Sequence, residues 1–200
     1  MQQANPSTTF QLLLSTTEQT IQELGCKKTT LQEIINRTGL SKGAIYHYVK
    51  SKDELLGLVL QHRMEQTNAR FDEAVAASSS QDITLPLQAL TEQFGHMLLN
   101  EQEVGNQIFF YLLSQQDNPE VKKILAQHYE NSIQFSVRWI QIGQQNNVIP
   151  PELDPYRTSK MFWVYLHGLR IQRLLAPHAE KLDLHSLFSM FYHTLKMEQA

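Results

Sequence analysis

A short run of side chains between residues 41 and 49 has the chemistry to contact a polyanion. Three consecutive positions offer a long basic, an absent and a small side chain, and two tyrosines and a histidine follow within about one helical turn. These residues are Lys42, Gly43, Ala44, Tyr46, His47 and Tyr48. Phenol and imidazole groups can hydrogen-bond phosphate, and aromatic faces can rest on a sugar or a thymine methyl. A backbone with small side chains can approach base edges closely, so the run is suited to contact DNA.

Two short predicted helices must position this run. Thr30-x-x-Glu33 is a capping box that starts a helix over about 31–38, and Ser41 can cap a second helix over about 42–49. Gly39 allows a sharp turn between them, Leu40 can fill the angle, and Ile45 is expected to point inward. The arrangement is a helix-turn-helix, whose second helix enters the major groove in DNA-binding proteins.

Charge is concentrated in the same stretch. The whole chain has a net charge of −3, whereas residues 26–52 carry six basic residues and one acidic residue, a net charge of +5. A basic stretch on an otherwise acidic chain can be an electrostatic footprint for phosphate, although charge alone fits a solvated surface equally well.

The run from Thr29 to Leu56, TTLQEIINRTGLSKGAIYHYVKSKDELL, resembles the amino-terminal domain of the tetracycline-repressor (TetR) family. The paired threonines, the GLSKG turn, the YHY helix and the SKDEL start all match the family at its spacing, and the resemblance covers roughly residues 8–60. It implies an all-α fold of nine helices, with a helix-turn-helix DNA-binding domain over 5–52 and an effector-binding and dimerisation domain over 53–200. It also implies a homodimer that reads a palindromic operator as a repressor released by a small molecule.

The resemblance assigns DNA contacts by position. Thr30 caps its helix against a phosphate, Tyr48 lies on the phosphate side, and Lys52 starts the next helix as a phosphate-binding lysine. The full expected set is Thr30, Gln32, Lys42, Gly43, Ala44, Tyr46, His47, Tyr48 and Lys52. The chain departs from the family pattern at Thr16 and Thr17, where alanines are usual, at Cys26, where an aromatic residue is common, and in having no basic arm before the first helix.

Helical spacing dominates the rest of the chain, and loop or proline signals separate the helices. The first helix carries Phe10 to Leu24 and ends at Gly25. Further helices are expected over about 52–77, 84–100, 103–116, 119–146 and 155–176, with a last one carrying Leu184 to Leu195.

Aromatic, histidine and methionine residues in these helices form the expected effector pocket, for which a neutral or aromatic ligand is favoured because few charges lie among them. The pocket set is Phe94, His96, Met97, Phe109, Phe110, His128, Trp139, Trp163 and His167. Residue for residue, ordinary core packing is the favoured interpretation. Apolar stripes on the last two helices predict a dimer interface, although a monomer could bury them internally. Its expected residues are Gly168, Leu184, Leu187, Phe188, Phe191 and Leu195.

Other chemistries find little support in the sequence. Glu92 and His96 share a helix face but have no third metal ligand, and the single cysteine, Cys26, suggests packing rather than redox sensing. No phosphate loop or catalytic motif is present, so we expect no enzyme, no cofactor and no metal. The longest apolar run, Met161 to Leu166, is far short of a membrane span, which predicts a cytoplasmic protein. A helical ligand- or protein-binding module that does not bind DNA is the remaining alternative.

Overall fold

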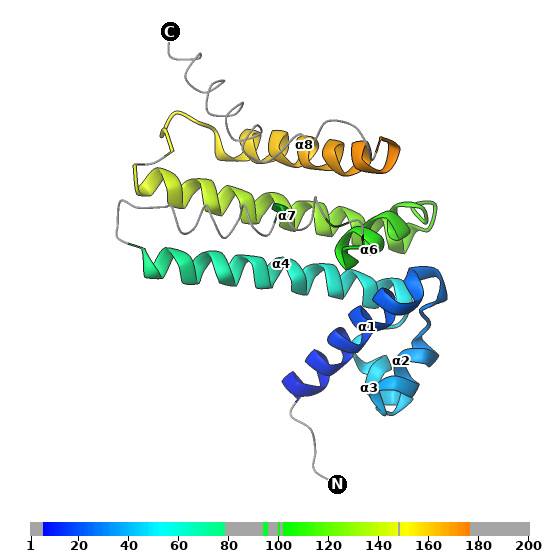
Figure 1. Ribbon diagram of the computed structural model, residues 1–200. Helices are drawn as coiled ribbons and strands as arrows, with labels where there is room; N and C mark the ends of the chain where they lie inside the picture. The colour runs from blue at the N-terminus through cyan, green and yellow to red at the C-terminus, as the bar shows by residue number, and fades with distance from the viewer. Residues whose placement is uncertain (1–5, 79–93, 96–99, 101, 148, 177–200) are drawn as a thin grey trace. The chain divides into compact units, whose positions relative to one another are not determined.

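The computed structural model describes residues 6–78, 94–95, 100, 102–147 and 149–176, and its regular secondary structure there is helical throughout (Figure 1). The helices are α1 (Pro6–Lys28), α2 (Leu31–Thr38), α3 (Lys42–Tyr48), α4 (Lys52–Ala77), α6 (Val104–Leu113), α7 (Pro119–Gln145) and α8 (Pro155–Leu175). The all-α prediction is confirmed. The nine-helix count is not: seven helices are found, and the helices expected over 84–100 and around 184–195 lie outside the described residues, apart from a helical Phe94 and Gly95.

Local signals decide where the first three helices end. Gly25 interrupts α1 with a φ of 75°, which a residue without Cβ adopts readily. Thr30 caps α2 by accepting a hydrogen bond from the Glu33 N–H at 3.1 Å, and Gly39 ends α2 with a φ of 68°. Ser41 caps α3 in the same way, accepting from the Ala44 N–H at 3.1 Å. The helix-turn-helix therefore follows from short-range hydrogen bonds.

One half of the expected capping box at Thr30 is replaced by another interaction. The Glu33 carboxylate would reach back to the cap backbone, but it accepts from Arg37 Nε at 2.6 Å instead. A hydrogen bond between two charged groups is stronger than one to a neutral backbone N–H, which accounts for the exchange. The Thr30 half of the box is kept.

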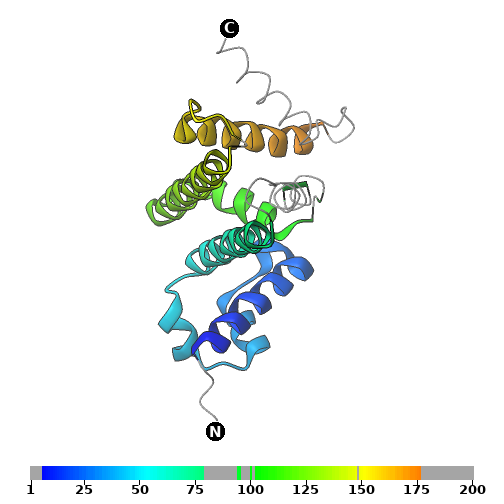
Figure 2. The ribbon, with the colours of Figure 1, turned by 90° about the vertical axis from the view of Figure 1, so that its left-hand side faces the viewer.

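The described residues form two compact units, one within 1–65 and 102–129 and the other within 66–101 and 130–200. In the first unit α1 packs against both α2 and α6, and Figures 1 and 2 show α2 and α3 beside α1. Its buried core is one cluster whose members include Leu13, Ile34, Ile45, Leu56 and Ile108. The helix-turn-helix thus shares its core with helices that follow residue 100 in the sequence.

A partly buried ion cluster joins three helices of the first unit. Arg63 on α4 binds the Glu103 carboxylate and lies 3.2 Å from a carboxylate oxygen of Glu18 on α1. Glu103 is also the cap of α6, because its side chain accepts from the Asn106 N–H at 2.7 Å. The Glu103 side chain is only 4% exposed, so its charge depends on Arg63 for compensation.

The two threonines that replace the family's alanines in α1 are accommodated without loss of helix. Thr16 and Thr17 are both buried. The Thr17 hydroxyl donates to the Leu13 carbonyl at 2.7 Å, and the Thr16 carbonyl accepts from the Thr20 hydroxyl at 2.7 Å. The hydroxyls of Thr17 and Thr20, which bond back along their own helix, need no partner from elsewhere in the core.

The second unit is organised around two tryptophans. Trp163 on α8 donates its indole N–H to the Ser132 carbonyl at 3.1 Å and the Ser136 hydroxyl at 2.9 Å, both on α7. Trp139 on α7 donates to Asn68 Oδ1 on α4 at 3.2 Å. Each buried ring therefore has its one polar group satisfied, which lets the indoles serve as core residues.

Replacing Arg63 by methionine should lower the unfolding free energy by about 3 kcal/mol, because Glu103 would remain buried without its cation. Arg138→Met is the matched control. It breaks a 2.7 Å pair with Asp72 in which both side chains are nearly half exposed, and it should cost less than about 1 kcal/mol. Urea unfolding at one fixed protomer concentration measures both losses. Equal losses would show that the Arg63 cluster is an ordinary surface ion pair.

Candidate nucleic-acid interface

Helix α3 has one buried and one exposed side. Ile45 is fully buried and Val49, its C-cap, nearly so. The exposed residues are Lys42, Gly43, Tyr46 and His47, at the spacing that places them on one helix face, and Ala44 and Tyr48 are half-buried. Tyr46 is 44% exposed. The geometry therefore presents an outward surface on α3, backed by a rigid core.

Ring contacts hold part of this surface in place. Lys42 Nζ lies 5.5 Å from the centroid of the Tyr46 ring, within the range of a cation–π contact. The Tyr48 ring packs 5.3 Å from Phe10 of α1 and 5.3 Å from His47. Tyr48 therefore anchors α3 to α1 and orients the imidazole beside it.

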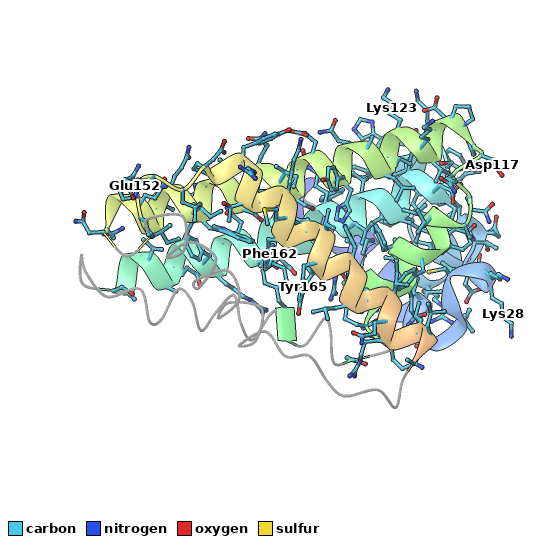
Figure 3. The ribbon with its side chains drawn as sticks, turned by 90° about the horizontal axis from the view of Figure 1, so that it is seen from above. Lys28, Asp117, Lys123, Glu152, Phe162 and Tyr165 are labelled. Atoms are coloured by element: carbon cyan, nitrogen blue, oxygen red, sulfur yellow. The ribbon has the colours of Figure 1, made fainter. Side chains whose placement is uncertain are left out.

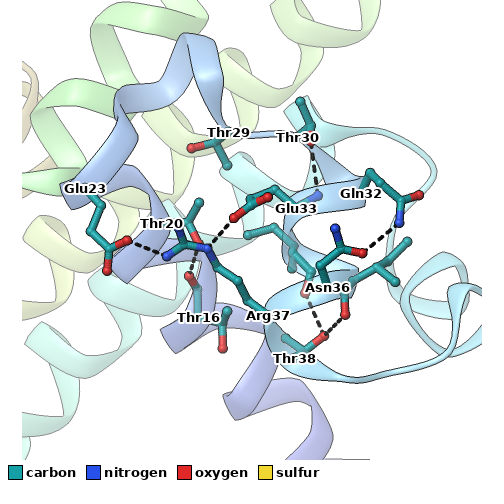
Figure 4. A network of polar contacts seen from close by, with 12 residues as sticks. Thr16, Thr20, Glu23, Thr29, Thr30, Gln32, Glu33, Asn36, Arg37 and Thr38 are labelled. Atoms are coloured by element: carbon teal, nitrogen blue, oxygen red, sulfur yellow. Dashed lines mark hydrogen bonds and ion pairs between the residues drawn. The ribbon is translucent and has the colours of Figure 1, made fainter.

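The exposed side of α2 adds polar groups to the helix-turn-helix (Figure 4). Gln32 Nε2 donates to Asn36 Oδ1 at 3.0 Å, one helical turn along, and both side chains are exposed. Arg37 pairs with Glu33 and with Glu23 of α1, each at 2.6 Å, and these hydrogen bonds raise the pKa of its guanidinium. The charge of Arg37 is therefore already used within the protein, which the sequence alone did not reveal.

Lys52 likewise has partners inside the first unit. It is half-buried, its ammonium donates to the Cys26 carbonyl at 2.8 Å, and Nζ lies 4.4 Å from the centroid of the Tyr111 ring on α6. The other lysines of the basic stretch, Lys27, Lys28, Lys42 and Lys50, are exposed. Figure 3 shows the side chain of Lys28 extending away from its helix.

The residues expected to line an effector pocket separate into two groups. Phe94, Trp139, Trp163 and His167 gather in the second unit, where Phe94 lies 6.0 Å from each tryptophan ring and His167 lies 5.6 Å from Trp163. Phe109, Phe110 and His128 gather in the first unit, with ring centroids 5.6 and 6.4 Å from Phe109. His96 and Met97 lie outside the described residues.

Sequence reasoning missed several members of the second-unit cluster. Phe71 is buried 5.7 Å from Trp139, and Asn68, one turn earlier on α4, binds the Trp139 indole. Ser132 and Ser136 hold the Trp163 indole from α7. The available signal was spacing, since residues 68 and 71 share one helix face and residues 132, 136 and 139 share another.

Of the expected dimer residues, only Gly168 is described. It is exposed on α8, and a Cβ built there meets no atom within 4 Å. Leu184, Leu187, Phe188, Phe191 and Leu195 lie outside the described residues. The helix around Gly168 exposes several large apolar side chains, namely Met161, Val164, Ile171, Leu174 and Leu175.

Comparison with known proteins identifies the class of this interface. Residues 13–59 match the family model described as "Bacterial regulatory proteins, tetR family". Over this segment the chain is similar to TetR-family regulators. Its helix-turn-helix lies within the matched segment, and the chain is a DNA-binding transcriptional regulator.

Relatives extend the similarity beyond that TetR segment. The HTH-type transcriptional regulator TtgR of Pseudomonas putida is 25% identical over 85% of this chain and 82% of its own length. A TetR-family transcriptional regulator from Agrobacterium tumefaciens has the same fold, with a TM-score of 0.57, 16% identity and coverage of 88% of this chain and 91% of that chain. A SmeT–triclosan complex aligns with a TM-score of 0.57 and 17% identity over 85% and 82% of the two chains.

The part of the chain that the structure describes shows neither a metal-ligand cluster nor a membrane-spanning helix. Within the described ranges no three His, Cys, Asp or Glu side chains come together in a way that could hold a metal ion, and Glu92 and His96 lie outside those ranges. None of the helices the structure describes has the length and apolarity needed to cross a membrane.

Cys26 is buried at the end of α1, and burial raises the pKa of its thiol from 9.0 to about 11, with the Lys52 charge acting in the opposite direction. We expect iodoacetamide to label native protein at pH 8 about a hundredfold more slowly than urea-unfolded protein, because the thiolate fraction is that much lower. The raised pKa stabilises the fold fully below pH 9, and this contribution is lost as the pH rises through 11. Equal labelling rates would show that the thiol is accessible and ionised. The chain has a single cysteine, so the label reports this site alone.

Proposed function

We propose that the chain is a homodimeric repressor that inserts α3 into the major groove of each half of a palindromic operator. The observation that carries the proposal is the exposed face of α3, where Lys42, Gly43, Tyr46 and His47 lie opposite the buried Ile45. A helix packed on one side and polar or open on the other can dock as a rigid body. Operator binding places its site of action in the cytoplasm.

The proposed contacts follow from this docking. Lys42, Gly43, Ala44, Tyr46 and His47 face the groove, while Thr30, Gln32 and Tyr48 flank it where the sugar–phosphate backbone passes. Thr30 and Ser41 cap the N-termini of α2 and α3, and backbone N–H groups at helix N-termini attract phosphate. The Lys52 ammonium adds a further contact to a DNA phosphate.

We further propose that a small neutral or aromatic effector binds among the aromatic residues of the second unit. Phe94, Trp139 and Trp163 meet there edge to face or nearly so. Rings with their N–H groups already bonded present apolar faces, which favours an uncharged ligand. The SmeT structure, which has a similar fold, is a complex with triclosan. Release from DNA requires that the effector bind the DNA-incompetent state more tightly.

The exposed apolar face of α8 supports the dimer. Met161, Val164, Gly168, Ile171 and Leu175 recur at intervals of three or four residues, and Val164 and Leu175 are 66% and 80% exposed. This stripe spans about 21 Å at 1.5 Å per residue. An apolar stripe of that length on one helix fits a two-fold interface with its copy, and Gly168 permits a close approach.

A DNA-selection experiment tests the proposal as a whole. Wild-type protein and a random duplex library should yield an enriched inverted repeat, with half-site centres one or more helical turns of about 34–36 Å apart. Failure to enrich any sequence, with correctly folded protein, would favour the alternative of a helical binding module that keeps this fold without binding DNA.

On the enriched duplex, Lys42→Ala should weaken binding and reduce the salt slope by about one per protomer, or about two per dimer, if Lys42 contacts phosphate. Lys122→Ala is the matched control, since Lys122 is an exposed lysine on α7 outside the helix-turn-helix, and its slope should be unchanged. Fluorescence anisotropy across a salt series measures both. A wild-type slope for Lys42→Ala would remove this lysine from the phosphate contacts.

Val164→Glu combined with Ile171→Glu should raise the dimer dissociation constant roughly a hundredfold or more, because each charge would be buried unpaired in a two-fold seam. Gln141→Glu supplies the same charge at an exposed position of α7 and should leave the dimer intact. Sedimentation velocity over a concentration series gives the answer. A folded double variant that remains dimeric would place the interface elsewhere.

A further inference from the structure

Lys52 occupies an unusual position for a lysine expected to bind DNA. It is the first residue of α4, four residues after the last residue of α3, and so lies close in sequence to the proposed interface. Its ammonium nevertheless donates to the Cys26 carbonyl and lies 4.4 Å from the Tyr111 ring centroid. The carbonyl lies directly after Gly25, near the carboxyl end of α1. Both partners compete with phosphate for the same charge.

Tyr111 is held firmly enough to act as such a partner. It lies seven residues after Val104, on the face of α6 whose residues Val104, Ile108 and Leu112 belong to the buried core of the first unit. The start of α6 is fixed by Glu103, which caps the helix and binds Arg63 of α4. The ring therefore stands at a defined place beside the first turn of α4.

We propose that Tyr111 is a positioning residue that withholds Lys52 from DNA phosphate, so that binding DNA through Lys52 requires this contact to open. The inference rests on the proposed DNA-binding function and deepens it, because it makes the position of α6 a determinant of phosphate affinity. When the ring is removed, the Cys26 carbonyl still competes with phosphate for the Lys52 ammonium. The ammonium then reaches phosphate at a lower cost.

The test measures affinity for a random-sequence DNA duplex, because a phosphate contact carries no sequence information. Tyr111→Leu keeps an apolar side chain and removes the ring, and it should bind about fivefold more tightly than wild type. Tyr111→Phe keeps the ring and should bind like wild type. If wild-type protein does not bind the duplex at low salt, the proposed function itself is refuted. That result is distinct from a failure of the Tyr111 inference, in which wild type binds and Tyr111→Leu binds no more tightly.

A double-mutant cycle assigns the gain to the lysine. Lys52→Ala and Lys52→Ala/Tyr111→Leu should have the same affinity, and the salt slope of Tyr111→Leu should exceed theirs by about one per protomer. A merely structural role for Tyr111 would lower affinity and would act equally in both backgrounds. The inference fails if Tyr111→Leu binds no more tightly than wild type, or if its gain persists without Lys52.

A second measurement observes Lys52 in the wild-type chain and needs a variant only to assign its signal. Reductive methylation with ¹³C-formaldehyde labels the lysines and preserves their charge, and Lys52→Arg identifies the Lys52 signal by its loss. The Tyr111 ring should shift that signal upfield, and an excess of random-sequence duplex should abolish the shift. A signal without the shift in free protein, or one that keeps it in the complex, would overturn the proposal.

Discussion

The proposed DNA-contacting surface depends on an apolar core that the helix-turn-helix does not supply alone. Ile34 and Ile45 belong to the same buried cluster as Val104, Ile108 and Val121 of α6 and α7. The two short helices of the helix-turn-helix bury too little surface to be stable by themselves, so they rely on other helices, including ones that come later in the chain. The exposed face of α3 can present polar and aromatic groups to a partner because its opposite face is fixed by this shared core.

The parts of the fold that the sequence predicts well are those decided over a few residues. Thr30, Gly39 and Ser41 define α2, α3 and the turn between them through hydrogen bonds to residues no more than four positions away. Side-chain type and spacing are enough to indicate such contacts. The exposed and buried faces of α3 follow for the same reason, since Ile45 is the apolar residue in the middle of a short polar helix.

Contacts between residues far apart in the sequence could not be predicted in this way. Glu103 compensates Arg63 across 40 positions, and Tyr111 reaches Lys52 across a longer stretch still. Helical periodicity says which face a side chain is on, but not which other helix that face meets. The aromatic residues show the same limit: one list drawn from the sequence divides into a cluster around Phe109 and another around Trp163, one in each unit. The predicted boundary between the DNA-binding and effector-binding domains, near residue 52, also stays a prediction. It was placed at the end of the helix-turn-helix motif, whereas the buried core of the first unit includes residues beyond it.

These partners also change the electrostatic argument for DNA binding. The net charge of +5 over residues 26–52 counts Arg37, whose charge is balanced by Glu23 and Glu33, and Lys52, whose ammonium is engaged inside the first unit. Four exposed lysines then carry the attraction to phosphate, assisted by neutral donors such as helix N-termini and hydroxyl groups. Few counterions are released by so few cations, so a smaller share of the binding free energy is salt-dependent and independent of sequence. In the proposed complex, the fit of the α3 face to base edges must then account for more of the affinity, and the core behind Ile45 holds that face in place.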